Sequence, residues 1–281
     1  DKNVNIIYGD NAQGKTNILE SIYFCATSKS HRGSKDKDIV KFGESESHIK
    51  ANVIKNDISY RIDMHLKSNK PKGIAVNGIP IKKAVDLFGI IKVVLFSPED
   101  LNIIKDGPSQ RRRFMDMELS QLNKIYLSNL VNFNKVLGQR NKLLKELAFN
   151  PSEEMISSLD IWDMQFERYG KCIIEGRKKF IRELNLIISE IHSKLTGGSE
   201  KLVVEYVPFL NEDELGSALS EYRKKDIKYK CSCAGPHKDD LVFNINGKDV
   251  RKYGSQGQQR TAALSLKLSE IELVKKIIKD K

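Results

Sequence analysis

Residues 9–16 place two glycines, a lysine and a threonine in the order G-x-x-x-x-G-K-T, a pattern that binds phosphate. The glycines let the backbone bend so that successive N–H groups point at one phosphate group. The lysine brings a positive charge to the terminal phosphates, and the hydroxyl of Thr16 is a ligand suited to Mg²⁺. We therefore predict a nucleoside triphosphate site. Its predicted residues are Gly9, Asp10, Asn11, Ala12, Gln13, Gly14, Lys15 and Thr16.

A second polar segment, 255–258, has the order Ser-Gln-Gly-Gln and precedes the last predicted helix. It resembles the signature of ABC-type ATPases, whose usual order is Leu-Ser-Gly-Gly-Gln. In that motif a serine hydroxyl and a glycine N–H at a helix start reach the γ-phosphate held by a second molecule. A helix start capped by polar side chains is the other interpretation. The candidate residues for the γ-phosphate are Ser255, Gly257 and Gln258.

The elements that must hold the phosphate loop are predicted from the apolar pattern around it. Residues 4–8 suit a buried strand, and apolar residues at helical spacing predict a helix after the loop. Residues 49–64 alternate on either side of two turn residues, which predicts an antiparallel hairpin. A second hairpin is predicted over 74–79, and a short central strand over 93–96.

Long helices are predicted beyond Pro108. Apolar residues at steps of three and four predict one helix of about 40 residues, which Asn150 and Pro151 end. A second helix is predicted from 152 to 195, before a pair of glycines that suits a helix C-terminus. The remaining predictions are a strand over 201–207, a helix over 210–222, a strand over 241–247 and a helix over 258–278.

These elements indicate a chain in three parts. Residues 1–107 form an ATPase lobe with the phosphate loop and the hairpins, 108–227 form a helical lobe or arm, and 228–281 return to the head with the signature segment. The predicted fold class is α/β: a P-loop ABC-type ATPase head with a mixed sheet and an inserted helical lobe.

Composition narrows the range of partners. Lys+Arg 48 against Asp+Glu 37 gives a net charge of +11, which favours a polyanion such as nucleic acid, although many basic proteins have no such partner. No apolar run reaches the roughly 18 residues that a membrane span needs. Four cysteines are too few for a disulfide framework, so we expect a cytoplasmic protein with free thiols and no membrane partner.

Six segments carry a more specific resemblance. They occur in order at 9–17, 29–32, 96–101, 111–116, 235–241 and 254–261. Together they resemble the RecF family of bacterial recombination mediators over essentially the whole chain. The resemblance implies an ATP-dependent DNA-binding protein of gap repair, replication restart and SOS induction. It implies RecO and RecR as partners, the loading of RecA at gapped DNA, and weak ABC-type ATP hydrolysis by the full-length protein.

The resemblance also assigns roles to single residues. ATP is then the nucleotide, with Mg²⁺ on Thr16, and Asn17 extends the match of the phosphate loop. The signature residues would complete the site of a second molecule, which implies an ATP-dependent homodimer. Glu99 stands where related ATPases place a glutamine that senses the metal ion. Because a carboxylate has no amide N–H to donate, that function is in doubt here.

Four arginines are candidates for contact with DNA. Arg32 follows the predicted P-loop helix, where related heads carry an arginine that touches nucleotide or DNA. A solvated loop cation is the alternative for Arg32. Arg111, Arg112 and Arg113 begin the first arm helix, where a solvated basic helix start is the alternative to a DNA contact.

Three other patterns have structural interpretations. The acidic pair at 239–240 precedes a strand and is predicted as part of a turn rather than as a metal site. Cys231, Cys233 and His237 lack a fourth zinc ligand at a suitable spacing, so buried thiols are expected. The aromatic residues of the second long helix are predicted to pack in the core, rather than to stack on bases. They are Trp162, Phe166 and Tyr169.

No segment has the Walker B pattern of an apolar strand ending in two acidic residues, so no catalytic residue is predicted in this chain. The simplest interpretation is a fragment that lacks parts at both ends. Two other classes of function stay open. The nucleotide-binding subunit of a membrane transporter would share both motifs, and a small-molecule kinase would share the phosphate loop alone.

Overall fold

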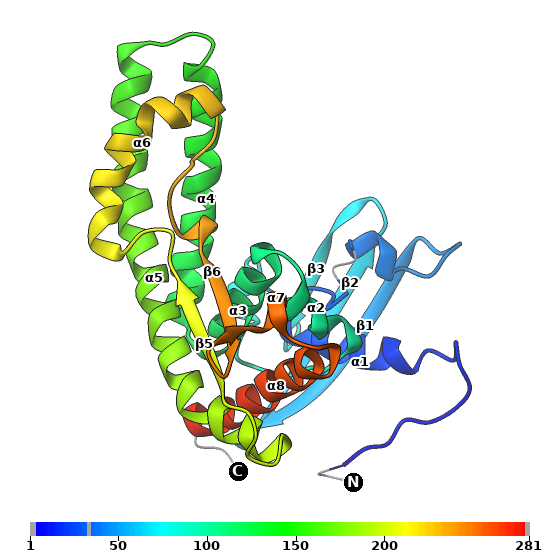
Figure 1. Cartoon of the computed structure of the whole chain (residues 1–281). Coiled ribbons are helices and arrows are strands. Elements are labelled where there is room, and N and C mark those ends of the chain that lie inside the picture. Colours follow the sequence, from blue (N-terminus) through cyan, green and yellow to red (C-terminus); the bar gives the residue numbers. More distant parts are fainter. Residues whose placement is uncertain (1–3, 33–34, 279–281) are drawn as a thin grey trace. The chain divides into compact units, whose positions relative to one another are not determined.

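The computed structural model describes residues 4–32 and 35–278 and divides the chain into two compact units, 1–95 and 96–281. The boundary follows the second predicted hairpin and precedes the long helices. The division into 1–107, 108–227 and 228–281 stays a prediction. Each unit is described by itself below, with the element labels of Figure 1.

Among its described residues, the first unit contains one α-helix beside an antiparallel sheet of strand order β1-β2-β3-β4. Both predicted hairpins are confirmed. Asn56 and Asp57 turn the first, and Asn77 and Gly78 the second, all four with positive φ as a tight two-residue turn requires. The elements are α1 (Lys15–Thr27), β1 (Glu46–Lys55), β2 (Ile58–Lys67), β3 (Lys70–Val76) and β4 (Ile79–Pro80).

The core of this unit lies between α1 and one face of the sheet. Phe24 and Cys25 of α1 are buried together with Ile62, Met64 and Leu66, which alternate along β2. Because successive side chains of a strand point to opposite faces, the residues between them lie on the outer face of the sheet. The predicted helix after the phosphate loop is therefore confirmed, and its C-terminal half provides the buried residues.

Two predicted strands are wrong. Residues 4–8 form no strand, and Ile6 and Tyr8 are 81% and 91% exposed. Residues 92–97 also form no strand, and Phe96 is exposed. An apolar segment becomes a strand only where a neighbouring backbone supplies ladder hydrogen bonds, and sequence pattern does not show whether that neighbour is present. The two sheets of the described residues are both antiparallel.

The second unit is dominated by an arm of two long helices that lie side by side (Figure 1). The predicted second arm helix is confirmed as α5 (Glu153–Leu195). The Ser152 side chain accepts a hydrogen bond from Met155 N at its start, and Gly197 and Gly198 follow its end with positive φ. The preceding helices are α2 (Leu101–Lys105), α3 (Pro108–Leu122) and α4 (Lys124–Leu147).

The first arm helix was predicted as continuous, and the structure corrects this. Asn123, with φ −140° and ψ 107°, separates α3 from α4. Its side chain accepts hydrogen bonds from Ile125 N and Tyr126 N, so it caps the start of α4. Apolar spacing continues across the break because both helices pack on the same core, and spacing alone therefore conceals it.

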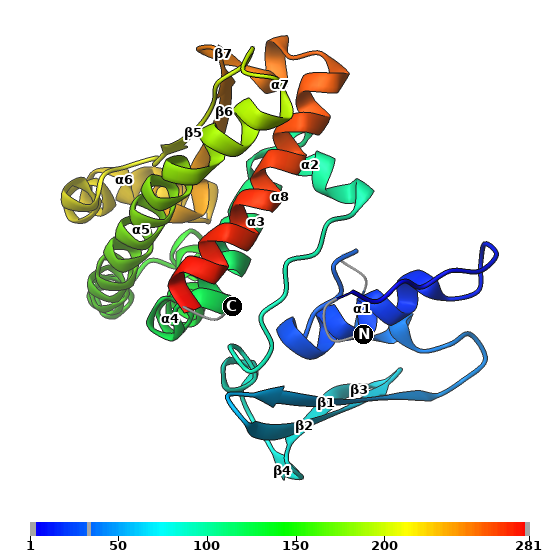
Figure 2. The ribbon, with the colours of Figure 1, turned by 90° about the horizontal axis from the view of Figure 1, so that it is seen from below.

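The rest of the unit is an antiparallel sheet of order β5-β6-β7 with three more helices. The predicted strands and the last helix are confirmed, but the helix predicted at 210–222 begins later and runs further. In Figure 2, α8 runs alongside α5, against which it packs. The elements are β5 (Leu202–Val207), α6 (Leu215–Tyr229), β6 (Asp240–Ile245), β7 (Lys248–Asp249), α7 (Val250–Tyr253) and α8 (Gln256–Ile278).

Arg140 links several segments of the arm through hydrogen bonds and ion pairs. The side chain of this α4 residue is fully buried and donates to Asp163 of α5 and to Asp226 of α6, each over 2.6 Å. It also donates to Ser232 Oγ over 2.8 Å. A buried guanidinium is tolerated only where carboxylates and other acceptors replace its water, and here α5, α6 and the loop after α6 supply acceptors for Nε and Nη1.

Candidate nucleotide site and signature segment

The phosphate loop has the backbone shape that its glycines predict. Gly9 and Gly14 have φ of 146° and 84°, and Ala12 also has a positive φ, 65°. Such alternation of backbone conformation turns successive N–H groups toward one concave side, where an anion binds. The loop is exposed from residue 9 to residue 13 and leads directly into α1.

The start of α1 favours negative charge. Within the described residues, no side chain caps this helix and its first turn has no acidic residue. Its first N–H groups and the positive end of its dipole therefore remain available to an anion. Lys15 Nζ donates to the carbonyls of Gly9 and Asp10 over 2.7 and 2.6 Å, which holds the ammonium over the loop. These features fit a triphosphate, and Thr16, the next residue, is exposed and would hold Mg²⁺.

Arg32 lies beside the same helix. Its guanidinium is 3.6 Å from Glu20, which also accepts a hydrogen bond from Ser30 Oγ over 2.5 Å. Arg32 and Asn17 line one hollow of about 260 Å³ on this side of α1. The structure thus brings these two predicted residues together, with the Arg32 side chain 40% exposed and partly neutralised by Glu20.

The signature segment forms the helix cap that was one of its two interpretations. Ser255 Oγ accepts from Gln258 N over 3.2 Å, and Gln258 Oε1 accepts from Ser255 N over 2.9 Å. This reciprocal pair is a capping box at the start of α8. Capping does not exclude the γ-phosphate interpretation, because accepting that bond leaves the Ser255 hydroxyl its own hydrogen to donate. Ser255 and Gly257 are exposed at the helix start.

A chain of hydrogen bonds supports this cap from the arm. Gln258 Nε2 donates to Glu200 Oε1 over 2.8 Å, and the other oxygen of Glu200 lies 3.2 Å from His192 Nε2. His192 is buried near the end of α5, and its Nδ1 lies 2.8 Å from Ser265 Oγ on α8. Sequence reasoning missed this series of hydrogen bonds, because Glu200 and Gln258 come together only in the tertiary structure.

The segment around Glu99 lies next to α8. Pro98–Asp100 form a short 3₁₀ turn, in which Ser97 N donates to Asp100 Oδ2 over 2.7 Å. A hollow of about 420 Å³ separates this turn from α8. Its lining residues are Phe96, Ser97, Pro98, Leu101, Arg260, Thr261, Ala263 and Leu264. The turn that contains the predicted Q-loop position therefore lies next to the helix that carries the signature, and the Glu99 side chain is exposed.

Arg111 departs from both of its predicted roles. It is 2% exposed and binds Asp240 with two hydrogen bonds, from Nε over 2.6 Å and from Nη2 over 2.9 Å. Arg112 donates to the backbone carbonyl of Asp239 over 2.6 Å, whereas Arg113 is exposed. The basic run is therefore neither a uniformly solvated helix start nor a single exposed patch, because its residues point in different directions around α3.

Asp239 is buried, and Asp240 is half-buried as the first residue of β6, which corrects the prediction of turn residues. Asp239 Oδ2 accepts from Arg177 over 2.8 Å and from the hydroxyl of Tyr206. Arg177 also binds Asp116 over 2.8 Å, which joins α5 to α3. Burial raises the pKa of the Asp239 carboxyl, and the charge of Arg177 opposes that rise. These ion pairs join α5 to α3 and to the residue that precedes β6.

The remaining predictions have mixed outcomes. Phe166 is buried in the core, and Trp162 and Tyr169 pack against it, as predicted. His237 Nε2 lies 2.9 Å from the carbonyl of Ser232, and burial lowers its pKa to about 4. The two cysteines beside it are half-buried free thiols, less enclosed than predicted. Throughout 4–32 and 35–278, no helix is long and apolar enough to cross a membrane.

A glycine-rich phosphate loop before a helix, antiparallel sheets and a helical arm define a P-loop ATPase head. The family model described as an AAA domain matches residues 1–280. The chain belongs to the RecF family of DNA replication and repair proteins. It is 73% identical over 279 residues to the RecF protein of Lachnospira eligens, covering 99% of this chain and 77% of that relative. For the RecF protein of Agathobacter rectalis the identity is 58%, covering 99% and 76%.

Two solved structures have the same fold over nearly the whole chain. One is the recombination mediator protein RecF-ATP in the RecFOR pathway, with a TM-score of 0.93 and 38% identity, covering 99% of this chain and 76% of that one. The other is RecF-ATPrS in the same pathway, with a TM-score of 0.88 and 36% identity, covering 98% and 76%. The predicted fold class is therefore confirmed.

Proposed function

We propose that the chain binds ATP with Mg²⁺ through residues 9–17. The observation that supports this most strongly is the geometry of the phosphate loop. The Lys15 ammonium lies over the loop, and the uncapped start of α1 faces the same anion site. Lys15 would neutralise the β- and γ-phosphates, and Thr16 would hold Mg²⁺, whose charge offsets that of the triphosphate. The solved structure of a RecF protein with ATP supports this assignment.

The signature segment would act on the ATP of a second molecule. Ser255 has a hydroxyl hydrogen to donate, and Gly257, which has no side chain of its own, presents its backbone N–H at the exposed helix start. Because ADP lacks the γ-phosphate that these groups would contact, the protein is expected to form a two-fold homodimer with ATP and not with ADP. The γ-phosphate would then decide whether the two copies stay together.

The biological proposal follows from the family. We infer that the protein binds DNA at gaps and acts with RecO and RecR to load RecA in gap repair, replication restart and SOS induction in the cytoplasm. The net charge of +11 supports a polyanionic partner. Arg32 and Arg113 are the exposed candidates for DNA contact, whereas Arg111 is committed to Asp240. Membership of the RecF family leaves the transporter and kinase alternatives without support.

Sedimentation of the protein with a slowly hydrolysed ATP analogue and Mg²⁺ tests the dimer. Wild type should sediment as a dimer with the analogue and as a monomer with ADP. Ser255→Arg should remain monomeric with both, while its affinity for the analogue stays within about threefold of wild type, because the phosphate loop is unchanged. Equal dimer fractions for the two proteins would show that the signature proposal is wrong.

DNA binding is tested by its dependence on salt. Each phosphate neutralised by lysine or arginine releases counterions, so the logarithm of the binding constant should fall linearly with log[salt]. Titration of fluorescent gapped DNA at several salt concentrations measures the slope. Arg113→Ala should reduce the slope by about one unit, the value expected for one phosphate contact. A flat salt response of the wild type would remove DNA from the proposed partners.

A further inference from the structure

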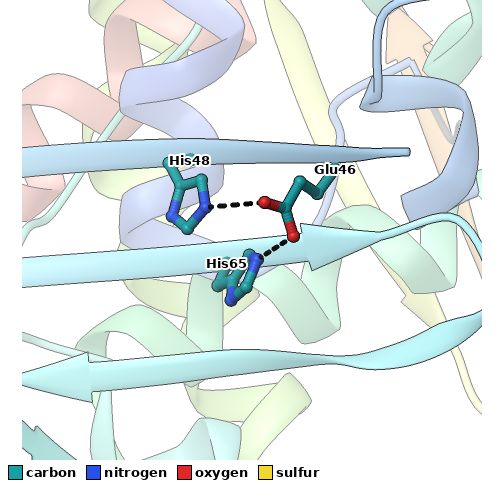
Figure 3. A group of neighbouring side chains, drawn as sticks. All are labelled: Glu46, His48 and His65. Atoms are coloured by element: carbon teal, nitrogen blue, oxygen red, sulfur yellow. Dashed lines mark hydrogen bonds and ion pairs between the residues drawn. The ribbon is translucent and has the colours of Figure 1, made fainter. Parts of the chain in front are cut away.

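Two histidines and a glutamate gather on the outer face of the first sheet (Figure 3). His48 on β1 lies directly opposite His65 on β2, and their rings are stacked with centroids 3.9 Å apart. Glu46, two residues before His48, points its carboxylate at both rings. Its Oε2 is 2.9 Å from His65 Nε2, and its Oε1 is 3.9 Å from His48 Nε2.

The sheet fixes this arrangement. Residues two apart on a strand share a face, and the antiparallel register places His65 beside them. One nitrogen from each imidazole and one carboxylate oxygen all lie within 4.8 Å of one another. Small rotations of the side chains bring three such atoms to the bond lengths of about 2.0–2.2 Å that zinc requires.

The cluster is accessible to an ion and its water. The side chains of His48, His65 and Glu46 are 64%, 37% and 45% exposed. Gly73 on β3 pairs with His65 and brings no side chain to this face. A hollow of about 600 Å³, lined in part by both histidines and Gly73, opens beside them. A metal ion could therefore enter without any movement of the backbone.

We propose that Glu46, His48 and His65 bind a divalent transition-metal ion, with Zn²⁺ as the preferred ion. Imidazole nitrogens and a carboxylate oxygen suit Zn²⁺ better than Mg²⁺ or Ca²⁺, which take oxygen ligands. Three protein ligands leave one coordination position of a tetrahedral ion for water or an outside ligand. The site lies on the sheet surface and is independent of the proposed ATP function.

Lys67 competes with the metal ion for the carboxylate. Its Nζ is 3.2 Å from Glu46 Oε2, the oxygen that also faces His65. The ammonium must move aside for a metal ion to bind, and its charge opposes the incoming cation. Loss of Lys67 should therefore raise the affinity for metal.

Competition with a chromogenic zinc chelator at pH 7.5 tests the proposal on the whole chain. Wild type should bind one Zn²⁺ at this site, and His48→Ala and His65→Ala should each lower the affinity at least about tenfold. Lys67→Met should raise it. The matched control is His31→Ala, which removes an imidazole from the same unit outside the cluster and should leave the affinity unchanged. Circular dichroism confirms that the exposed substitutions leave the sheet folded.

The four cysteines are a competing set of possible zinc ligands. Co²⁺ distinguishes them, because thiolate coordination gives an intense charge-transfer absorption that imidazole and carboxylate ligands do not. Cobalt bound without that absorption, and lost in His48→Ala, is the expected result. Zinc affinity that is equal in wild type and in the His48→Ala, His65→Ala double variant would overturn the proposal, as would a cobalt spectrum dominated by thiolate.

Discussion

Gln258 Nε2 and Glu200 Oε1 are 2.8 Å apart, although 57 residues separate them in the chain. This hydrogen bond joins the first turn of the signature helix to the turn that follows the arm helix α5. Because Gln258 also caps Ser255, the position of the Ser255 hydroxyl depends on Glu200 through one intervening side chain. The end of the arm helix is thus connected to the group proposed to contact the γ-phosphate.

Glu200→Ala should weaken ATP-dependent dimerisation without weakening ATP binding. The change removes the acceptor that fixes the Gln258 amide, so the helix start that presents Ser255 loses its support. Glu200→Gln keeps an acceptor oxygen and should restore most of the dimer. Sedimentation with the slowly hydrolysed analogue measures both variants. If Glu200→Ala forms as much dimer as wild type, this bond does not position the signature.

Gly257→Ala should stabilise the fold while impairing the dimer. A Cβ at this position would meet its nearest atom, Ser255 Oγ, at 3.7 Å, which is ordinary contact. Exchanging a helical glycine for alanine raises the free energy of unfolding by about 0.5–1 kcal/mol. The added methyl would nevertheless lie beside the proposed γ-phosphate contact. Urea unfolding and sedimentation of one sample measure the two effects.

The matched control is Gly138→Ala in α4, where an added Cβ meets nothing within 4 Å. It should give a similar gain in stability with an unchanged dimer fraction. Should both alanine variants dimerise like wild type, close approach at Gly257 is not required.

Lys15→Ala should abolish measurable ATP binding. The ammonium that lies over the Gly9 and Asp10 carbonyls is the charge proposed to neutralise the terminal phosphates, and backbone N–H groups cannot replace it. Equilibrium titration with a fluorescent ATP analogue measures the effect. Lys41→Ala, at an exposed lysine of the same unit, is the control and should bind like wild type. Affinity of Lys15→Ala within about threefold of wild type would contradict the assignment.

Stability should fall as pH rises from about 4.5 to about 7 because of Glu118. Burial raises the pKa of this α3 carboxyl to about 7, against the opposing charge of Lys267. A carboxyl with a raised folded-state pKa favours the folded state when protonated. Its contribution is therefore present near pH 4.5 and is lost as pH rises toward about 7. The loss should amount to as much as about 3 kcal/mol.

Glu118→Gln is neutral at every pH and should flatten this dependence, with a higher free energy of unfolding than wild type at pH 8. Urea unfolding at pH 5, 7 and 8 measures the three values. Burial also raises the pKa of Glu270, so a weaker slope should remain. Glu221→Gln, at an exposed carboxylate, should leave the slope unchanged. A wild-type stability that rises over this range would contradict the prediction.

The sequence by itself determined the local elements and the class of site. The glycine positions of the phosphate loop, the two-residue turns at 56–57 and 77–78 and the ends of α5 all depend on residues within a few positions of one another. Their conformations are set by backbone sterics and short-range hydrogen bonds, which act in the same way wherever the segment lies. The signature segment was also visible as a helix cap, since Ser255 and Gln258 are three residues apart.

Only the tertiary structure decided which charged and apolar residues interact with partners distant in the chain. Arg111 was expected at a solvated helix start and Asp240 in a turn, yet they form an ion pair in which the Arg111 side chain is buried. Residues 4–8 and 93–96 have strand-like patterns but do not form strands. Glu200 and Gln258, and His48 and His65, likewise meet only through helix packing and strand register. Ladder bonds and ion pairs depend on a partner distant in the chain, and no local pattern shows where that partner lies.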